Sequence, residues 1–114
     1  MQDCIFCKMV RREIKPDVVL ETDQVLGFRD LNPQAPTHIL VIPKKHIATL
    51  NDITAQDVAM MGELFNAAKT IAAQEGLAER GYRTVVNCNR DAGQSVFHVH
   101  LHLLGGRALN WPPG

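Results

Sequence analysis

Histidine alternates strictly with apolar residues along residues 98–104, which read His-Val-His-Leu-His-Leu-Leu. Successive side chains of a β-strand point to opposite faces, so a strand here directs His98, His100 and His102 to one face. On a helix the same three side chains would spread around the axis, because each residue turns by about 100°. The pattern therefore predicts a strand with an apolar face in the core and three imidazoles on its other face.

The other apolar positions predict two helices. Helical spacing indicates a short helix within residues 4–13 and a long helix that begins near Thr54 and ends at Gly76. Thr54 can cap the long helix together with Asp57. The core face predicted for the long helix is formed by Val58, Met61, Phe65, Ala68 and Ala72, with Leu64 and Ile71 beside them.

Apolar runs also indicate strands over residues 18–21, 25–29, 38–43 and 83–88, ahead of the histidine strand. In the strand at 38–43, His38, Leu40 and Ile42 share a face. The prolines of residues 32–36 favour a loop. This order of elements predicts an α+β fold: a five-stranded, mostly antiparallel sheet with one long and one short helix.

Length and charge limit the kinds of partner. A chain of 114 residues fits a single domain over residues 1–114. Twelve basic and twelve acidic residues cancel, so neither nucleic acid nor an anionic membrane is expected as a partner. No apolar run reaches the ~18 residues of a membrane span, and the first residues lack the features of a signal peptide. Three cysteines, an odd number, argue against a disulfide framework and for the reducing cytoplasm.

A polar loop, residues 87–95, directly precedes the histidine strand. Gly93 permits the backbone to approach a ligand closely, and successive amides there can form an anion-binding concavity. A neutral imidazole is a nucleophile at physiological pH, and neighbouring donors can stabilise charge that develops on phosphoryl oxygens. The loop and the histidines together indicate a phosphate site that needs no metal for catalysis.

Residues 98–104 resemble the signature of the histidine triad (HIT) superfamily. Asp30 and the segments 33–38, 43–46, 93–95 and 109–114 are similar to its Hint branch, the purine nucleoside phosphoramidases. The resemblance spans nearly the whole chain and implies a HIT domain that forms homodimers whose sheets join across the interface. It also implies that the protein hydrolyses an adenosine or guanosine 5′-phosphoramidate to a nucleoside monophosphate and an amine.

The same resemblance implies roles for individual residues. His100 is the nucleophile, His38 supports its proton relay, Ser95 contacts the leaving group, and His98 and His102 complete the catalytic set. Asp30 holds the ribose hydroxyls, since a carboxylate can accept two hydrogen bonds. The implied phosphate contacts are Asn87, Gly93, Gln94, Ser95 and His102. The implied base pocket is formed by Phe6, Met9, Ile14, Phe28 and Leu31. Trp111, in a tail that carries two prolines, is expected near the active site of the partner protomer.

Cys4 and Cys7 form a C-x-x-C pair that departs from the commonest Hint pattern. Two thiolates and two histidines can form a closed tetrahedral zinc site. Resemblance to some bacterial members and to the related uridylyltransferases implies His46 and His98 as the other ligands. Such a zinc would be structural, because four protein ligands leave no open position. The alternative is that two reduced cysteines simply pack the short helix.

Two functions of other classes stay open at this point. A zinc-dependent hydrolase or metal-binding module would use His98, His100 and His102 together. A nucleotide sensor would keep Asp30 and the loop at Gly93 without turning its ligand over. The sequence leaves the physiological amine, the pathway and the preference for adenine or guanine undetermined.

Overall fold

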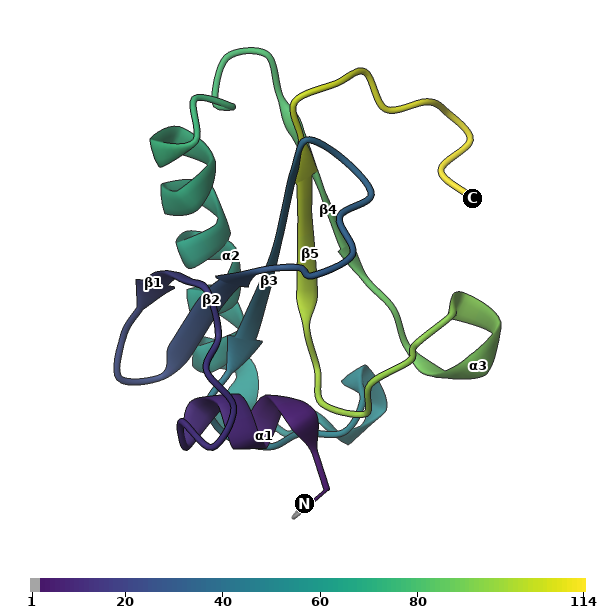
Figure 1. Ribbon diagram of the computed structural model, residues 1–114. Coiled ribbons are helices and arrows are strands. Elements are labelled where there is room, and N and C mark those ends of the chain that lie inside the picture. The colour runs from purple at the N-terminus through teal and green to yellow at the C-terminus, as the bar shows by residue number, and fades with distance from the viewer. Residues whose placement is uncertain (1–2) are drawn as a thin grey trace.

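The computed structural model describes residues 3–114 and is built on a five-stranded sheet with the strand order β1-β2-β3-β5-β4 (Figure 1). All four pairs of neighbouring strands are antiparallel. The predicted α+β class and antiparallel sheet are therefore confirmed. Met1 and Gln2, which belong to the predicted domain of residues 1–114, lie outside the described residues. The strands are β1 (Val18–Glu21), β2 (Val25–Arg29), β3 (Thr37–Pro43), β4 (Tyr82–Val86) and β5 (Leu101–Gly105).

Helices pack on both faces of this sheet (Figure 1). The long helix α2 (Val58–Gln74) covers one face, and the short helix α1 (Ile5–Val10) lies against the other. A further short helix, α3 (Asn89–Ala92), lies within the predicted polar loop between β4 and β5. Two 3₁₀ turns, η1 (Leu50–Asp52) and η2 (Ala55–Asp57), lead from β3 into α2. No helix within residues 3–114 has both the length and the apolar character needed to cross a membrane.

Side chains of β3 alternate between the two faces, as a strand requires. Ile39 and Val41 pack with α2, whereas Leu40 and Ile42 join the apolar cluster under α1. In β5 the leucines at positions 101 and 103 are buried in the α2 cluster. His102 pairs with Leu40 in the ladder and therefore faces the α1 side of the sheet. The apolar half of the histidine pattern thus builds the core, as predicted.

The histidine segment is only partly a strand, which corrects the predicted range of 98–104. Strand β5 begins at Leu101, so His98 and His100 precede it. The ladder with β3 ends at the pair Val41–Leu101, two residues before Pro43, which has no N–H to donate. The Val99 N–H instead donates to the carbonyl of Ile47, at 2.7 Å. This early end of the ladder frees the backbone carbonyl of His98 for another partner.

The predicted core face of α2 is confirmed for Leu64, Ala68, Ile71 and Ala72 but wrong in its rotation about the helix axis. Val58 is 63% exposed and Phe65 is 50% exposed, although both were expected in the core. The helix is turned by about one residue from the expected face, so that Met60 and Ala67 are buried in place of Val58 and Phe65. Thr54 and Asp57 do form a capping box, but on η2, which continues directly into α2. The residues that α2 buries are Met60, Leu64, Ala67, Ala68, Ile71 and Ala72.

Candidate active site and metal centre

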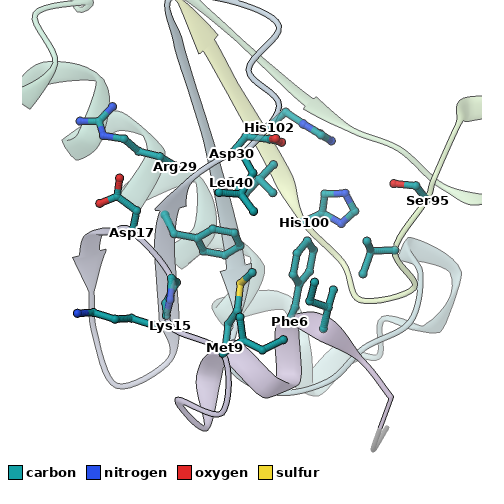
Figure 2. Close-up of a pocket in the computed structure, with 16 residues that line it drawn as sticks. Phe6, Met9, Lys15, Asp17, Arg29, Asp30, Leu40, Ser95, His100 and His102 are labelled. Carbon is teal, nitrogen blue, oxygen red and sulfur yellow. The ribbon is translucent and has the colours of Figure 1, made fainter.

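A cavity of about 280 Å³ opens between α1, the end of β2 and the start of β5 (Figure 2). Its apolar walls include the five residues for which the family resemblance implies a base pocket: Phe6, Met9, Ile14, Phe28 and Leu31. Its polar lining includes four further residues expected at the site, which are Asp30, Ser95, His100 and His102. Apolar walls beside a polar end at Ser95, His100 and His102 suit a ligand that joins a flat apolar ring to a charged group.

His100 is 5% exposed and lies at the polar end of the cavity. Its Nδ1 lies 2.8 Å from the backbone carbonyl oxygen of His98. A carbonyl oxygen only accepts, so Nδ1 carries the proton and Nε2 keeps its lone pair. Burial lowers the pKa of His100 from its usual value, which favours the neutral ring. Figure 2 shows the Ser95 side chain pointing toward this ring.

His38, His102 and Asp30 form a second hydrogen-bonded group beside His100. The backbone N–H of Gln34 donates to His38 Nδ1 at 3.0 Å, so His38 Nε2 carries the proton. That Nε2 lies 2.9 Å from His102 Nδ1 and 3.5 Å from an Asp30 carboxylate oxygen. With Nδ1 accepting, the neutral His102 ring has its own proton on Nε2. His38 therefore contacts His102 and Asp30. The family resemblance implies a different role for His38, in the proton relay of His100.

Both rings of this pair are held neutral by their surroundings. Burial, with smaller contributions from His100 and His38, lowers the pKa of His102 to about 4. Burial also lowers the pKa of His38, although the Asp30 carboxylate opposes that shift. Near neutral pH the pair can therefore donate hydrogen bonds to an anion without carrying a full positive charge.

The backbone amides expected to bind phosphate are instead hydrogen-bonded to carbonyl groups of their own loop. The backbone amides of Gly93 and Gln94 donate to the carbonyls of Arg90 and Asn89, at 3.0 and 3.1 Å. The buried Gln94 side chain accepts from the Asn89 N–H and donates to the carbonyls of Ala48 and Val96. Gly93 and Gln94 do not line the cavity. Asn87, which is half-buried, does not line it either. Their geometry shapes the loop that carries Ser95.

Trp111 lies away from the cavity of its own chain. Its side chain is 80% exposed, and the Arg83 guanidinium carbon lies 6.0 Å from the centre of its ring. A cation over an aromatic face is a weak attraction at an exposed site. The Trp111 ring thus keeps a large apolar area available for another surface.

Cys4, Cys7, His46 and His98 bring one donor atom each to within 4.8 Å of one another. His98 Nε2 lies 2.7 Å from the Pro43 carbonyl oxygen, so it carries the proton and Nδ1 faces the cluster with its lone pair. Burial, and the neighbouring Cys4 thiol, raise the pKa of Cys7, so a bound cation would be needed to favour the thiolate.

The spacing of these four donors fits a metal. His98 Nδ1 lies 3.3 and 3.5 Å from the two sulfurs, and His46 Nδ1 lies 3.2 Å from Cys7 Sγ and from His98 Nδ1. A tetrahedron with zinc–nitrogen and zinc–sulfur bonds of normal length has edges of about 3.3 to 3.8 Å. Two sulfurs and two imidazoles at these distances match the preferences of Zn²⁺.

The three triad histidines do not share a metal site in residues 3–114. The second group of donors found close together there is Asp30, His38 and His102, without His98 or His100. In that group His38 Nε2 carries a proton because the Gln34 N–H occupies Nδ1. A protonated ring nitrogen is not a ligand. The geometry therefore separates His98, in the cysteine cluster, from His100 and His102, at the cavity.

Several residues that line the cavity were not singled out from the sequence. Leu40 could have been found, because it shares a face of its strand with His38. The segment 15–17 is a loop without periodicity, and nothing local marks it as part of a site. The lining residues missed are Ile5, Lys15, Pro16, Asp17, Arg29, Leu40 and Val96.

Known proteins resemble this chain over nearly its full length. It is 52% identical over 108 residues to the purine nucleoside phosphoramidase of Escherichia coli K12, which covers 95% of this chain and 91% of that protein. The HIT family hydrolase from Legionella pneumophila superposes with a TM-score of 0.96 at 54% identity, over 98% of this chain and 100% of that one.

A zinc-bound histidine triad family protein from Mycobacterium smegmatis gives a TM-score of 0.80 at 33% identity, over 93% of this chain and 76% of that one. The HIT domain family matches residues 11–109. With the fold, the histidine segment and these relatives in agreement, the chain belongs to the HIT domain family.

Proposed function

We propose that this protein hydrolyses purine nucleoside 5′-phosphoramidates to a nucleoside monophosphate and an amine, through a covalent nucleotidyl group on His100. One observation carries the proposal: the His98 carbonyl holds the His100 ring so that Nε2 keeps its lone pair at the polar end of the cavity. The E. coli relative, a purine nucleoside phosphoramidase, supports the substrate class.

In the first step, His100 Nε2 attacks the phosphorus and the phosphorus–nitrogen bond breaks. The amine leaves with a proton that reaches it from solvent through the Ser95 hydroxyl. The His102 Nε2–H donates to a phosphoryl oxygen as charge develops there. Its own orientation is held by His38, whose Nε2 lies 2.9 Å from His102 Nδ1.

In the second step, water attacks the phosphorus and the bond to His100 Nε2 breaks. The nucleoside monophosphate is released, Nε2 regains its lone pair, and a proton of the water replaces the one taken by the amine. The first step requires a neutral His100 ring, and burial lowers the pKa of His100, which favours that form near pH 7.

The nucleotide is proposed to lie with its base against α1 and its ribose at Asp30. Phe6 and Met9 form the wall on the α1 side, and Phe28 forms the wall on β2. One oxygen of Asp30 accepts the Asn32 N–H at 2.7 Å, which leaves further lone pairs for the ribose hydroxyls. Because the Gly93 and Gln94 amides are occupied, we assign the phosphate contacts to Ser95 and His102.

We propose that Cys4, Cys7, His46 and His98 hold a structural zinc. When bound, zinc would tie α1 to the segments after β3 and before β5, and stabilise the fold without entering catalysis. The donor distances support this site, and a histidine triad family protein from M. smegmatis is zinc-bound. Catalysis itself needs no cofactor, since the nucleophile and its supports are side chains and backbone groups of this chain.

We propose a homodimer of single-domain chains of residues 1–114 in the cytoplasm. Strand β4 ends the sheet, and an open edge strand favours pairing with a second copy. The exposed apolar Val58 and Phe65 on α2 supply further surface for such an interface. The three free cysteines suit a reducing compartment. Analytical ultracentrifugation would report the assembly directly.

The function is tested by incubating the protein with a panel of adenosine and guanosine phosphoramidates and measuring nucleotide release, with and without a metal chelator. Turnover that survives the chelator is expected, together with a nucleotidyl adduct on the peptide that contains His100. Activity lost with the metal and restored by it would instead support a zinc hydrolase. Tight nucleotide binding without any release would support a sensor.

A further inference from the structure

Helix α1 belongs to both sites at once. Cys4 caps the helix and Cys7 lies in it, and both contribute sulfur to the metal cluster. Phe6 and Met9, on the same six-residue helix, line the cavity and are buried. A change that anchors or releases α1 through its cysteines therefore acts on a wall of the nucleotide cavity as well.

Phe6 contacts the histidines of both sites. The centre of its ring lies 5.9 Å from that of His98 and 5.2 Å from that of His100, and both contacts are edge-on. It also packs edge-on against Phe28, at 5.5 Å, within the cavity wall. With only 5% of its surface exposed, Phe6 cannot shift without moving these neighbours.

His98 supplies a second link. Its ring nitrogen Nδ1 faces the two sulfurs, at 3.3 and 3.5 Å, while its backbone carbonyl accepts from His100 Nδ1 at 2.8 Å. A ligand that fixes the His98 ring therefore also restrains the carbonyl that orients the nucleophile.

Helix α1 is too short to be stable alone. Isolated helices below about 12 residues are marginal in water, and α1 has six residues. Its apolar contacts join Phe6 and Met9 to the cluster of Leu26, Phe28, Leu40 and Ile42. Two ligands would engage different residues of α1, so each ligand would spend less free energy on ordering the helix once the other is bound.

We infer that metal binding at the cysteine cluster and nucleotide binding in the cavity are positively coupled through α1, with Phe6 as the positioning residue that joins them. The inference rests on the proposed nucleotide function. Coupling of binding free energies is reciprocal, so each ligand must raise the affinity for the other by the same factor.

The test measures both affinities with Zn²⁺ and adenosine 5′-monophosphate (AMP). A chromophoric chelator competes for Zn²⁺ with and without saturating AMP, and calorimetry gives the AMP affinity of zinc-loaded and metal-free protein. We expect both affinities to rise by one common factor of about fivefold or more. A Cys4→Ser variant controls for Zn²⁺ complexed by AMP itself, and its AMP affinity should not respond to zinc.

Two substitutions on α1 test the role of Phe6. Phe6→Leu keeps all four metal donors, so Zn²⁺ should still bind while the coupling factor falls toward one. Met9→Leu, a nearly volume-conserving change at another lining residue of α1, should keep the factor. Circular dichroism verifies that each variant is folded. A Phe6→Leu protein with the full wild-type factor would exclude Phe6 as the link.

The outcomes separate the coupling from the proposed function. If AMP binds zinc-loaded and metal-free protein equally well, the coupling is wrong and the proposed function stands. If neither AMP nor guanosine 5′-monophosphate binds the zinc-loaded protein, the proposed nucleotide site is wrong and the coupling falls with it. Protein that binds no Zn²⁺ overturns the metal cluster and the coupling, and leaves the catalytic proposal intact.

Discussion

His98 and His100 are the same residue type, two positions apart and both buried, yet they offer different nitrogens to different sites. His98 donates from Nε2 to the Pro43 carbonyl and turns Nδ1 toward the two cysteines. His100 donates from Nδ1 to the His98 carbonyl and leaves Nε2 free at the cavity. One ring is oriented as the proposed metal ligand requires, and the other as the proposed nucleophile requires.

The difference lies in the backbone around the two rings. A carbonyl oxygen accepts only from a protonated nitrogen, so the position of the carbonyl decides which nitrogen keeps its lone pair. The His98 backbone takes part in both arrangements, because its carbonyl belongs to the very residue whose ring faces the cysteines. Identical side chains thus acquire distinct chemistry from the groups that hold them.

The largest effect expected is at the nucleophile. His100→Asn should lower kcat by at least about 10³-fold, because it removes the attacking nitrogen, while zinc content and AMP binding persist. His98→Asn is the matched control: it should lose zinc but keep the backbone carbonyl that orients His100, and so retain far more activity. Steady-state kinetics and metal analysis check both variants. Equal losses of activity in the two would remove the distinction between them.

The metal side of the comparison is tested at the cysteines. Cys4→Ser should lower zinc content and reduce Tm by about 8 °C or more, equivalent to roughly 2 kcal/mol, because metal binding contributes to folding free energy. Cys88→Ser serves as the control, since Cys88 lies outside the cluster. Thermal unfolding with metal analysis measures both effects. Matching melting curves for the two variants would favour reduced cysteines that only pack the helix.

A pH series extends the comparison to His102, whose Nδ1 accepts from His38. Burial lowers the pKa of His102 to about 4, against about 6.5 in an unfolded chain. The unfolded state therefore takes up the proton first, and the free energy of unfolding falls as pH drops from about 6.5 toward 4.

Replacing His102 should weaken this dependence. The free energy of unfolding, measured in urea, should fall between about pH 7 and pH 5 in both proteins compared. The fall should be about 1 kcal/mol smaller in the His102→Gln variant than in the protein that keeps His102. Both proteins carry Cys4→Ser, so that zinc release makes no contribution. Parallel losses of stability in the two proteins would show that His102 is not held neutral by the fold.

The smallest effect is expected at the tail. Deleting residues 110–114 removes the exposed Trp111 ring and should change the ratio of kcat/KM for bulky and small amine leaving groups. A change of about fivefold corresponds to roughly 1 kcal/mol of lost contact. Dimerisation, followed by sedimentation, and base preference should change less. An unaltered ratio would exclude the tail from the site of either protomer.

Much of this protein follows from its sequence alone. The period of two in residues 98–104 determined that Leu101 and Leu103 enter the core and that His100 and His102 face the other side. The C-x-x-C spacing identified Cys4 and Cys7 as a pair, and helical spacing identified α2. These are local properties, because the backbone geometry of a helix or strand decides which side chains share a face.

Tertiary structure decided the remainder. Packing on the sheet decided which face of α2 is buried: Met60 and Ala67 lie in the core, whereas Val58 and Phe65 are exposed. The tautomers of His98 and His38 depend on the Pro43 carbonyl and the Gln34 amide, and Pro43 lies 55 residues from His98 in the chain. The loop of residues 15–17 reaches the cavity only because the sheet brings β2 beside it. Such contacts join distant segments, so their effect on burial and on proton positions exists only once the chain has folded.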